Sequence, residues 1–256
     1  MDYLEISVVE HCNLNCRYCS HFSPIAKELY ADLEETEQGI LLLKKIIKTD
    51  IKEIRLLGGE PLLHQKLADF CKLIRHHFPS SNIAVVTNGI LLTVISEDLW
   101  NTFMKNDINI KITKYPISLN FTKIREISEK YNVSVLYTNR SKTIKNMNHM
   151  PLDLKGQQDA MESYKLCYSS RCTNLKGTKI YPCPIVASIE HFNNYYSTDL
   201  QVTTKDYFDL EKNNNKIELE QFLSAPIPFC SYCMRKNITY DLPWAISEKD
   251  IKEWTP

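Results

Sequence analysis

Short apolar runs alternate with longer amphipathic segments through about the first 140 residues of the chain. Short runs rich in apolar and β-branched residues predict strands at 3–9, 53–57, 82–87, 108–113 and 133–138. Apolar residues at helical spacing predict helices at 36–49, 65–78, 97–105 and 121–131. A strand followed by a helix, repeated in this way, is typical of a parallel sheet with crossover helices.

These repeats are too few for a closed eight-stranded barrel. We therefore expect an α/β fold, a partial and open (β/α)5–6 barrel of the TIM type, over residues 1–150. The periodicity weakens after about residue 140, with one further helix expected at 156–165. Residues 151–256 are expected to form a small, cysteine-rich α+β extension.

Polar motifs follow the first three predicted strands. A cysteine-rich loop at 12–19 follows the first strand, the sequence GGEP at 58–61 follows the second, and Thr87-Asn88-Gly89 closes the third. The carboxyl ends of parallel strands meet at one edge of a sheet or barrel. The three motifs should therefore converge on one face of the molecule.

Composition narrows the possible partners. The 256 residues are 43% hydrophobic, which is enough for a sizeable core. The 31 basic and 31 acidic residues cancel, whereas a nucleic-acid-binding protein usually carries a basic excess. No apolar run is long enough to span a membrane, and the N-terminus does not resemble a secretory signal. We expect a cytoplasmic protein that binds neither nucleic acid nor membrane.

The nine cysteines indicate metal or cluster ligation, because a disulfide framework belongs in oxidising compartments. Cys12, Cys16 and Cys19 lie within eight residues of one another. A structural zinc site requires four ligands, so a zinc knuckle or a redox pair is the less favoured interpretation. Three thiolates can bind three irons of a [4Fe–4S] cluster and leave the fourth iron open.

The triad CNLNCRYC resembles the signature C-x3-C-x-aromatic-C of the radical S-adenosylmethionine (SAM) superfamily. The GGEP sequence after the second strand and Thr87-Asn88 after the third extend the resemblance over about residues 3–140. It implies that Cys12, Cys16 and Cys19 are the catalytic cluster ligands. It also implies a set of cofactor-binding residues, namely Tyr18, Gly58, Gly59, Glu60, Pro61, Thr87 and Asn88.

The resemblance further implies the chemistry. SAM would bind the open iron through its amino and carboxylate groups, with the glycines allowing close approach and Glu60 accepting hydrogen bonds from the amino group. Reductive cleavage would give methionine and a 5′-deoxyadenosyl radical that abstracts a substrate hydrogen atom. A reductant such as flavodoxin or ferredoxin is the implied partner. His21 and Ser23, just after the triad, are further candidates to face SAM or substrate.

A second group of cysteines lies in the C-terminal part of the chain, at Cys167, Cys172, Cys183, Cys230 and Cys233. With a hairpin expected around Gly177, the layout resembles the twitch or shortened SPASM extension, which holds an auxiliary [4Fe–4S] cluster. The implied ligands are Cys183, Cys230 and Cys233 with either Cys172 or Cys167, and we favour Cys172. Zinc is the alternative, because four thiolates satisfy it equally well.

Twitch-bearing relatives include dehydrogenases of aminocyclitols. The resemblance therefore implies an oxidoreductase that dehydrogenates a small molecule. One alternative is a maturase that oxidises, epimerises or crosslinks a peptide. Another is a non-catalytic iron–sulfur or zinc-binding sensor module, but a sensor would not need the GGEP sequence.

Overall fold

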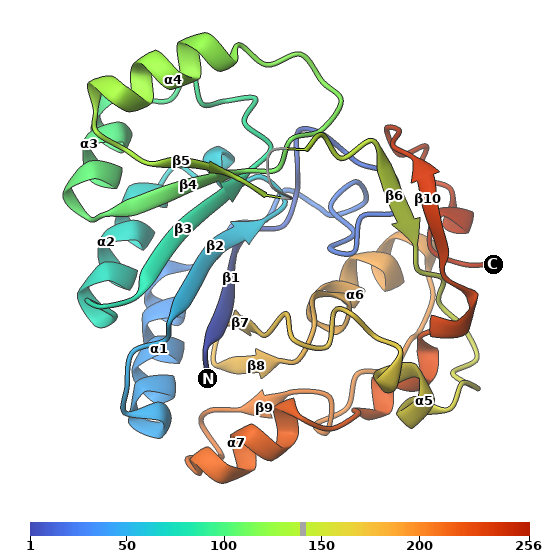
Figure 1. The fold of residues 1–256 in the computed structure, drawn as a ribbon. Coiled ribbons are helices and arrows are strands. Elements are labelled where there is room, and N and C mark those ends of the chain that lie inside the picture. The colour runs from blue at the N-terminus through green and yellow to red at the C-terminus, as the bar shows by residue number, and fades with distance from the viewer. Residues whose placement is uncertain (139–141) are drawn as a thin grey trace.

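The computed structural model describes residues 1–138 and 142–256. Parallel strands form its first part: β1 (Tyr3–Val9), β2 (Glu53–Gly58), β3 (Asn82–Thr87), β4 (Ile108–Ile112) and β5 (Val135–Tyr137). Crossover helices connect them: α1 (Leu33–Ile47), α2 (Leu67–His77), α3 (Glu97–Lys105) and α4 (Phe121–Lys130). Figure 1 shows the strands fanning across the middle of the molecule with these helices on one side. The predicted alternation of strand and helix is confirmed.

The sheet continues past β1 into the C-terminal part of the chain. Its order is β5-β4-β3-β2-β1-β7-β8-β9, with β7 (Asn174–Lys176) parallel to β1. β8 (Lys179–Tyr181) and β9 (Phe208–Asp209) follow in antiparallel order. Within the described residues the sheet does not close on itself, so the expected partial barrel is confirmed (Figure 1). The predicted hairpin is β7–β8, and Gly177 at its turn has a φ of 56°.

The remaining elements surround the open side of the sheet. Strands β6 (Asn146–His149) and β10 (Thr239–Pro243) form a separate antiparallel pair, side by side near the C-terminus in Figure 1. The helices here are α5 (Ala160–Lys165), α6 (Pro184–Tyr196) and α7 (Lys216–Leu223). No helix of the described residues is both long and apolar enough to cross a bilayer. The division of the chain at residue 150 stays a prediction.

Capping residues determine where the helices begin. α1 starts at Leu33, three residues before the predicted start, because the Asp32 carboxylate accepts a hydrogen bond from the Glu35 N–H at 2.9 Å. α5 likewise starts at Ala160 because Asp159 caps it, with its carboxylate 2.8 Å from the Glu162 N–H. In both cases a short acidic side chain satisfies an N–H group that lacks a partner within the helix.

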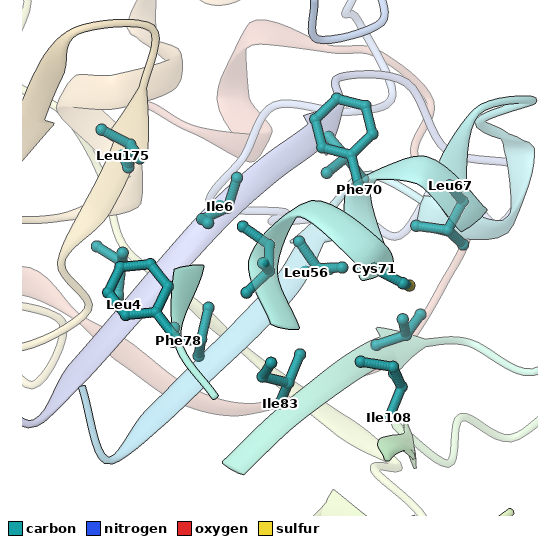
Figure 2. Close-up of a cluster of buried hydrophobic side chains, with 14 of the residues drawn as sticks. Leu4, Ile6, Leu56, Leu67, Phe70, Cys71, Phe78, Ile83, Ile108 and Leu175 are labelled. Carbon is teal, nitrogen blue, oxygen red and sulfur yellow. The ribbon is translucent and has the colours of Figure 1, made fainter. Parts of the chain in front are cut away.

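The main core lies between the crossover helices and the strands. α2 presents Leu67, Phe70 and Cys71 to the sheet, and all three are fully buried. Figure 2 shows this stripe facing Ile6, Leu56 and Ile83 of the strands. Cys71 is thus a packed core thiol, as its position on the apolar stripe predicts.

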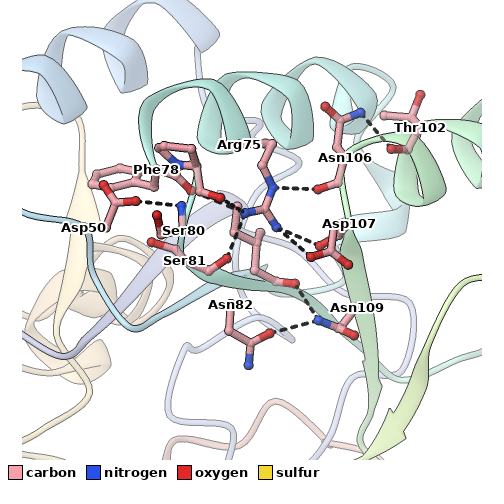
Figure 3. A network of polar contacts seen from close by, with 12 residues as sticks. Asp50, Arg75, Phe78, Ser80, Ser81, Asn82, Thr102, Asn106, Asp107 and Asn109 are labelled. Carbon is pink, nitrogen blue, oxygen red and sulfur yellow. Dashed lines mark hydrogen bonds and ion pairs between the residues drawn. The ribbon is translucent and has the colours of Figure 1, made fainter.

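A network around Arg75 ties together the loops at the amino ends of the strands, opposite the cysteine motifs (Figure 3). The guanidinium donates hydrogen bonds to backbone carbonyls of Asn106 at 2.7 Å, Asp107 at 2.8 Å, and Pro79 and Ser81 at 2.9 Å. These carbonyls follow α2 and α3, where helix ends leave acceptors without partners. The network stabilises the scaffold far from the candidate chemistry.

Candidate active site and second cysteine cavity

A cavity of about 500 Å³ lies at the carboxyl ends of β1 to β4. The residues of all three predicted motifs that line it are Cys12, Cys16, Tyr18, Cys19, Gly58, Gly59, Thr87 and Asn88. Their convergence follows from the parallel register, since β1, β2 and β3 end at the same edge of the sheet. The structure therefore brings the predicted motifs together around one space.

Each thiol of the triad has a different set of neighbours. The Cys12 Sγ accepts from the Leu14 N–H at 3.4 Å and from the Asn88 side-chain N–H at 3.7 Å. The Cys16 Sγ accepts from the indole N–H of Trp244 at 3.2 Å, from the opposite end of the chain. Strand β3 and the C-terminal segment both help to fix the cysteine loop.

These neighbours change the ionisation of the thiols. Burial raises the pKa of Cys12 to about 11 and that of Cys16 to about 12. Burial opposes ionisation of Cys19 as well, but hydrogen bonds with His21 and the Ser23 N–H outweigh it and lower the pKa of Cys19. Because thiolates rather than thiols bind metal, ligation here must displace protons, most readily from Cys19.

The two glycines of the GGEP sequence fit against the start of the cysteine loop. A Cβ atom on Gly58 would collide with the Val9 carbonyl oxygen, and one on Gly59 with the His11 carbonyl oxygen. The Gly59 N–H donates to the Val9 carbonyl at 2.8 Å. The close approach that requires glycine is thus between backbone segments of the protein, whereas the sequence suggested an approach to SAM.

Glu60 lies behind the wall of the cavity and does not line it. Its carboxylate is fully buried and accepts hydrogen bonds from the Thr87 hydroxyl at 2.7 Å and the Asn88 N–H at 2.9 Å. Burial raises the pKa of Glu60 to about 7. These bonds tie the end of β2 to the end of β3, and Pro61 starts a buried 3-10 turn, while contact of Glu60 and Pro61 with SAM stays a prediction.

The other candidate residues of the cysteine loop lie on the cavity wall. Tyr18 has a φ of 62° and packs its ring against His149 of β6, with 5.0 Å between centroids. His21 and Ser23 also line the cavity, and their contact with SAM or substrate stays a prediction. The aromatic side chain of Tyr18 therefore lies at the cavity wall in contact with β6.

Another part of the cavity wall was missed by the sequence reasoning. It comes from the segment around β6, with Asn146, Met147 and Asn148, and from Tyr168 and Ser169 after α5. The polar sequence NMNH has no alternating apolar pattern, so β6 is not recognisable as a strand. Its pairing with β10 is long-range, and a periodicity argument detects only local order.

A second, smaller cavity is lined by four cysteines, Cys167, Cys183, Cys230 and Cys233. Cys172 is not on this cavity, so the preference for Cys172 over Cys167 is corrected. Cys172 lies two residues before the start of β7, whose pairing with β1 sets Asn174 opposite Glu5. That pairing places Cys172 near Glu5 and Arg55. Burial and the negative charge of Glu5 raise the pKa of Cys172 to about 11, against the opposing charge of Arg55.

Arg235 adds a cation to this second cavity. It is only 6% exposed, and its guanidinium lies 3.8 Å from the Cys233 Sγ. Its Nε atom is buried without a hydrogen-bond partner among the described residues. A buried cation that forms no salt bridge with a carboxylate of the described residues favours an anionic occupant, such as a group bound by several thiolates. Across residues 1–138 and 142–256, no three His, Cys, Asp or Glu side chains are arranged to hold a single metal ion.

Comparison with known proteins agrees with this geometry. The family described as the radical SAM superfamily matches residues 6–150. A GTP 3′,8-cyclase of Campylobacter jejuni (strain RM1221) is 33% identical over 130 residues, which is 51% of this chain and 39% of the cyclase. A GTP 3′,8-cyclase of Aliarcobacter butzleri is 28% identical over 204 residues, or 78% of this chain and 58% of the cyclase. The chain thus spans less than two thirds of the length of these relatives.

Among solved structures, BtrN in complex with AdoMet and 2-DOIA is similar over 91% of this chain and 93% of BtrN. The TM-score is 0.53 at 15% identity, so the likeness concerns the fold. It includes the C-terminal part of the chain as well as the parallel strands. The sequence likeness to the cyclases covers 51% of this chain for the Campylobacter jejuni protein and 78% for the Aliarcobacter butzleri protein.

Proposed function

Because this chain belongs to the radical SAM superfamily, we propose that it is an oxidoreductase that dehydrogenates a small, uncharged or weakly charged molecule in the cavity beside Cys12, Cys16 and Cys19. Cys12, Cys16 and Cys19 would hold a [4Fe–4S] cluster, which would supply the electron for reductive cleavage of SAM to methionine and a 5′-deoxyadenosyl radical. The donor set fits this group, since three thiols border a cavity that leaves room for a further ligand. An external reductant such as flavodoxin or ferredoxin is the expected partner.

The residues of the chain serve this reaction by holding and shielding the site. Asn88 connects β3 to the loop, donating to the Asn13 side chain at 2.8 Å as well as to Cys12. Glu60 fixes the spacing of β2 and β3 beneath the cavity. Tyr18 and His149 of β6 pack against each other at the cavity wall, and a wall of this kind would limit the access of water to the reacting groups.

The observation that carries the proposed oxidation is the short segment between the two cavities. Cys167 lines the second cavity, while Tyr168 and Ser169, the next residues along the chain, line the first. Dehydrogenation of an alcohol carbon removes a hydrogen atom, a proton and one further electron. An acceptor for that electron, held by Cys167, Cys183, Cys230 and Cys233, would lie against the wall of the substrate cavity. We propose an auxiliary [4Fe–4S] cluster there.

Cyclisation of GTP is the second candidate, favoured by the sequence likeness to GTP 3′,8-cyclases. The charge of the cavity speaks against it. None of the described residues that line the cavity is Lys, Arg, Asp or Glu. A triphosphate is normally recognised by several cationic side chains or by a helix N-terminus. A neutral polyol or amino alcohol, held by groups such as Asn146, Asn148 and Tyr168, suits the cavity better. The fold shared with BtrN, whose complex holds AdoMet and 2-DOIA, supports the same choice.

The test is anaerobic turnover of the iron-loaded protein with SAM and a strong reductant. Aminocyclitols, GTP and short peptides would be supplied separately, and 5′-deoxyadenosine and the substrate-derived product would be followed by mass spectrometry. We expect an aminocyclitol to stimulate 5′-deoxyadenosine formation and to yield a product lighter by two hydrogen atoms. A GTP-derived product of unchanged mass would replace this proposal with cyclisation, and a modified peptide would indicate a maturase.

A further inference from the structure

The C-terminal segment, residues 244–254, lies directly against the loop that carries the cysteine triad. The Arg17 N–H donates to the Ala245 carbonyl at 2.9 Å, and the Ser247 N–H donates to the Asn15 carbonyl at 2.8 Å. Cys16 and Ile246 form an antiparallel bridge between the two segments. Residues near the two ends of the described chain therefore build one local structure around the middle cysteine.

Two tryptophans of this segment donate to the cysteine loop, but to different kinds of acceptor. The indole N–H of Trp244 donates to the Cys16 Sγ at 3.2 Å. The indole N–H of Trp254 donates to the Cys19 backbone carbonyl at 3.0 Å. The first bond reaches an atom that would ligate iron, whereas the second holds only the backbone of the loop.

The Trp244 indole is held in place on several sides. Its backbone N–H donates to the Lys145 carbonyl at 2.7 Å, next to the β6–β10 pair. Its ring lies 6.2 Å from the ring of Tyr115, which also lines the cavity. Arg17 pairs with Glu248 at 2.8 Å and with Glu253 at 3.4 Å, and so fixes the segment that follows. The donor is thus oriented before any ligand binds.

We propose that Trp244 is a positioning residue of the radical site, whose indole N–H bond to the Cys16 sulfur raises the reduction potential of the cluster on the triad. The inference rests on the proposed occupancy of the triad. One-electron reduction adds negative charge that is shared with the thiolate sulfurs and breaks no bond. A hydrogen bond to a ligating sulfur therefore stabilises the reduced form more than the oxidised form.

The test compares Trp244→Phe with Trp254→Phe as a matched control, both in the full chain loaded with iron and sulfide. Each variant keeps an aromatic ring and loses one indole donor. The potential would be measured without substrate by dithionite titration followed by electron paramagnetic resonance, using the signal that changes when SAM is added. We expect Trp244→Phe to shift the reduction equilibrium roughly tenfold toward the oxidised form, about 59 mV for one electron. Trp254→Phe should lower the melting temperature and leave this potential near that of the wild type.

A third variant separates hydrogen bonding from packing. Trp244→Gln lacks the ring but carries an N–H donor at the same number of bonds from Cα. Recovery of the potential in Trp244→Gln, or of iron loading if Trp244→Phe loads poorly, supports the proposal. Equal potentials in wild type and Trp244→Phe, an equal shift in Trp254→Phe, or loss of loading in both Trp244 variants overturns it.

The measurement also distinguishes this inference from the proposed reaction. A wild-type protein with a SAM-sensitive signal but no activity on alcohols would overturn only the proposed substrate oxidation. A wild-type protein with no SAM-sensitive iron signal would overturn both.

Discussion

The two cysteine groups of this protein differ in how they are assembled and in what surrounds them. The triad comes from one loop of eight residues and borders a cavity of about 500 Å³. The second group comes from three separate segments and encloses a much smaller space that it shares with Arg235. A site with three thiols and free volume suits a group that must also bind a cosubstrate. A site with four thiols and a buried cation suits a group that only exchanges electrons.

The largest expected effect tests the cysteine triad. Cys16→Ala should abolish formation of 5′-deoxyadenosine, because two thiolates cannot hold a cluster with one iron free for SAM. The product would be quantified by liquid chromatography and mass spectrometry after anaerobic reconstitution. Cys172→Ala serves as the control, since Cys172 lines neither cavity. SAM cleavage that survives in Cys16→Ala would contradict the role assigned to the triad.

The next largest effect tests the second group of cysteines. Cys167→Ala should reduce the iron bound per chain to about half and retain SAM cleavage, since only the auxiliary site loses a ligand. Substrate oxidation should be lost with it. Iron would be measured by a colorimetric assay against protein concentration. Cys172→Ala should keep the full iron content, and the reverse pattern in this pair would restore Cys172 as the ligand.

A third prediction concerns the ion pair that joins the two regions. Glu10 lies at the end of β1 just before the triad, and His191 lies on α6, which begins after Cys183. The Glu10 carboxylate accepts from His191 at 2.8 Å and lies 3.1 Å from the Lys176 ammonium. Burial alone would raise the pKa of Glu10, but the His191 hydrogen bond and the Lys176 charge lower it to about 2. Glu10→Gln should lower the free energy of unfolding by about 3 kcal/mol.

The pH dependence supplies the check on that ion pair. Because the folded state holds the Glu10 proton less tightly than the unfolded state, its stabilisation is present above about pH 4.5 and is lost as the pH falls toward about 2. The free energies of unfolding of the wild type and of Glu10→Gln, measured in urea across this pH window, should become equal at the acid end. A difference between the two proteins that does not change with pH would mean that the ion pair does not stabilise the junction.

The smallest expected effect concerns Glu60, which lies behind the cavity of the cysteine triad. Glu60→Gln should cost about 1–2 kcal/mol, since an amide nitrogen cannot accept a hydrogen bond as a carboxylate oxygen does. Burial raises the pKa of Glu60 from 4.5 to about 7, so its proton favours the folded state. This contribution is present below about pH 4.5 and is lost as the pH rises through about 7, opposite in sign to that of Glu10. The melting temperature should depend less on pH across this range in Glu60→Gln than in the wild type. An unchanged pH dependence would assign the effect to another group.

Local order was predictable from the sequence where one segment carries all the information. β3 at 82–87 and α3 at 97–105 have the predicted bounds, because their periodicity and their caps are local. The triad was recognisable for the same reason, since its ligands share one loop. The start of α1 was missed because Asp32, its cap, lies before the apolar pattern begins.

The second site shows why the rest was not predictable. Cys167 and Cys172 lie only five residues apart, and their spacing to Gly177 suits either choice. The pairing of β7 with β1 decides between them, and that register depends on a partner strand about 170 residues away. The role of Trp244 was equally unpredictable, because nothing in the sequence near residue 244 indicates that its indole donates to Cys16.

The contact between Cys16 and Trp244 also bears on how the protein is made. The two residues are 228 positions apart, so the cysteine loop leaves the ribosome long before the segment that completes it. Domains form during synthesis as their chains emerge, but the Trp244 contact of this loop forms only after residue 244 has been made. A triad that lacks this contact therefore exists for a time during synthesis. A polypeptide that ends before residue 244 would have the cysteine loop without the indole donor to the Cys16 sulfur.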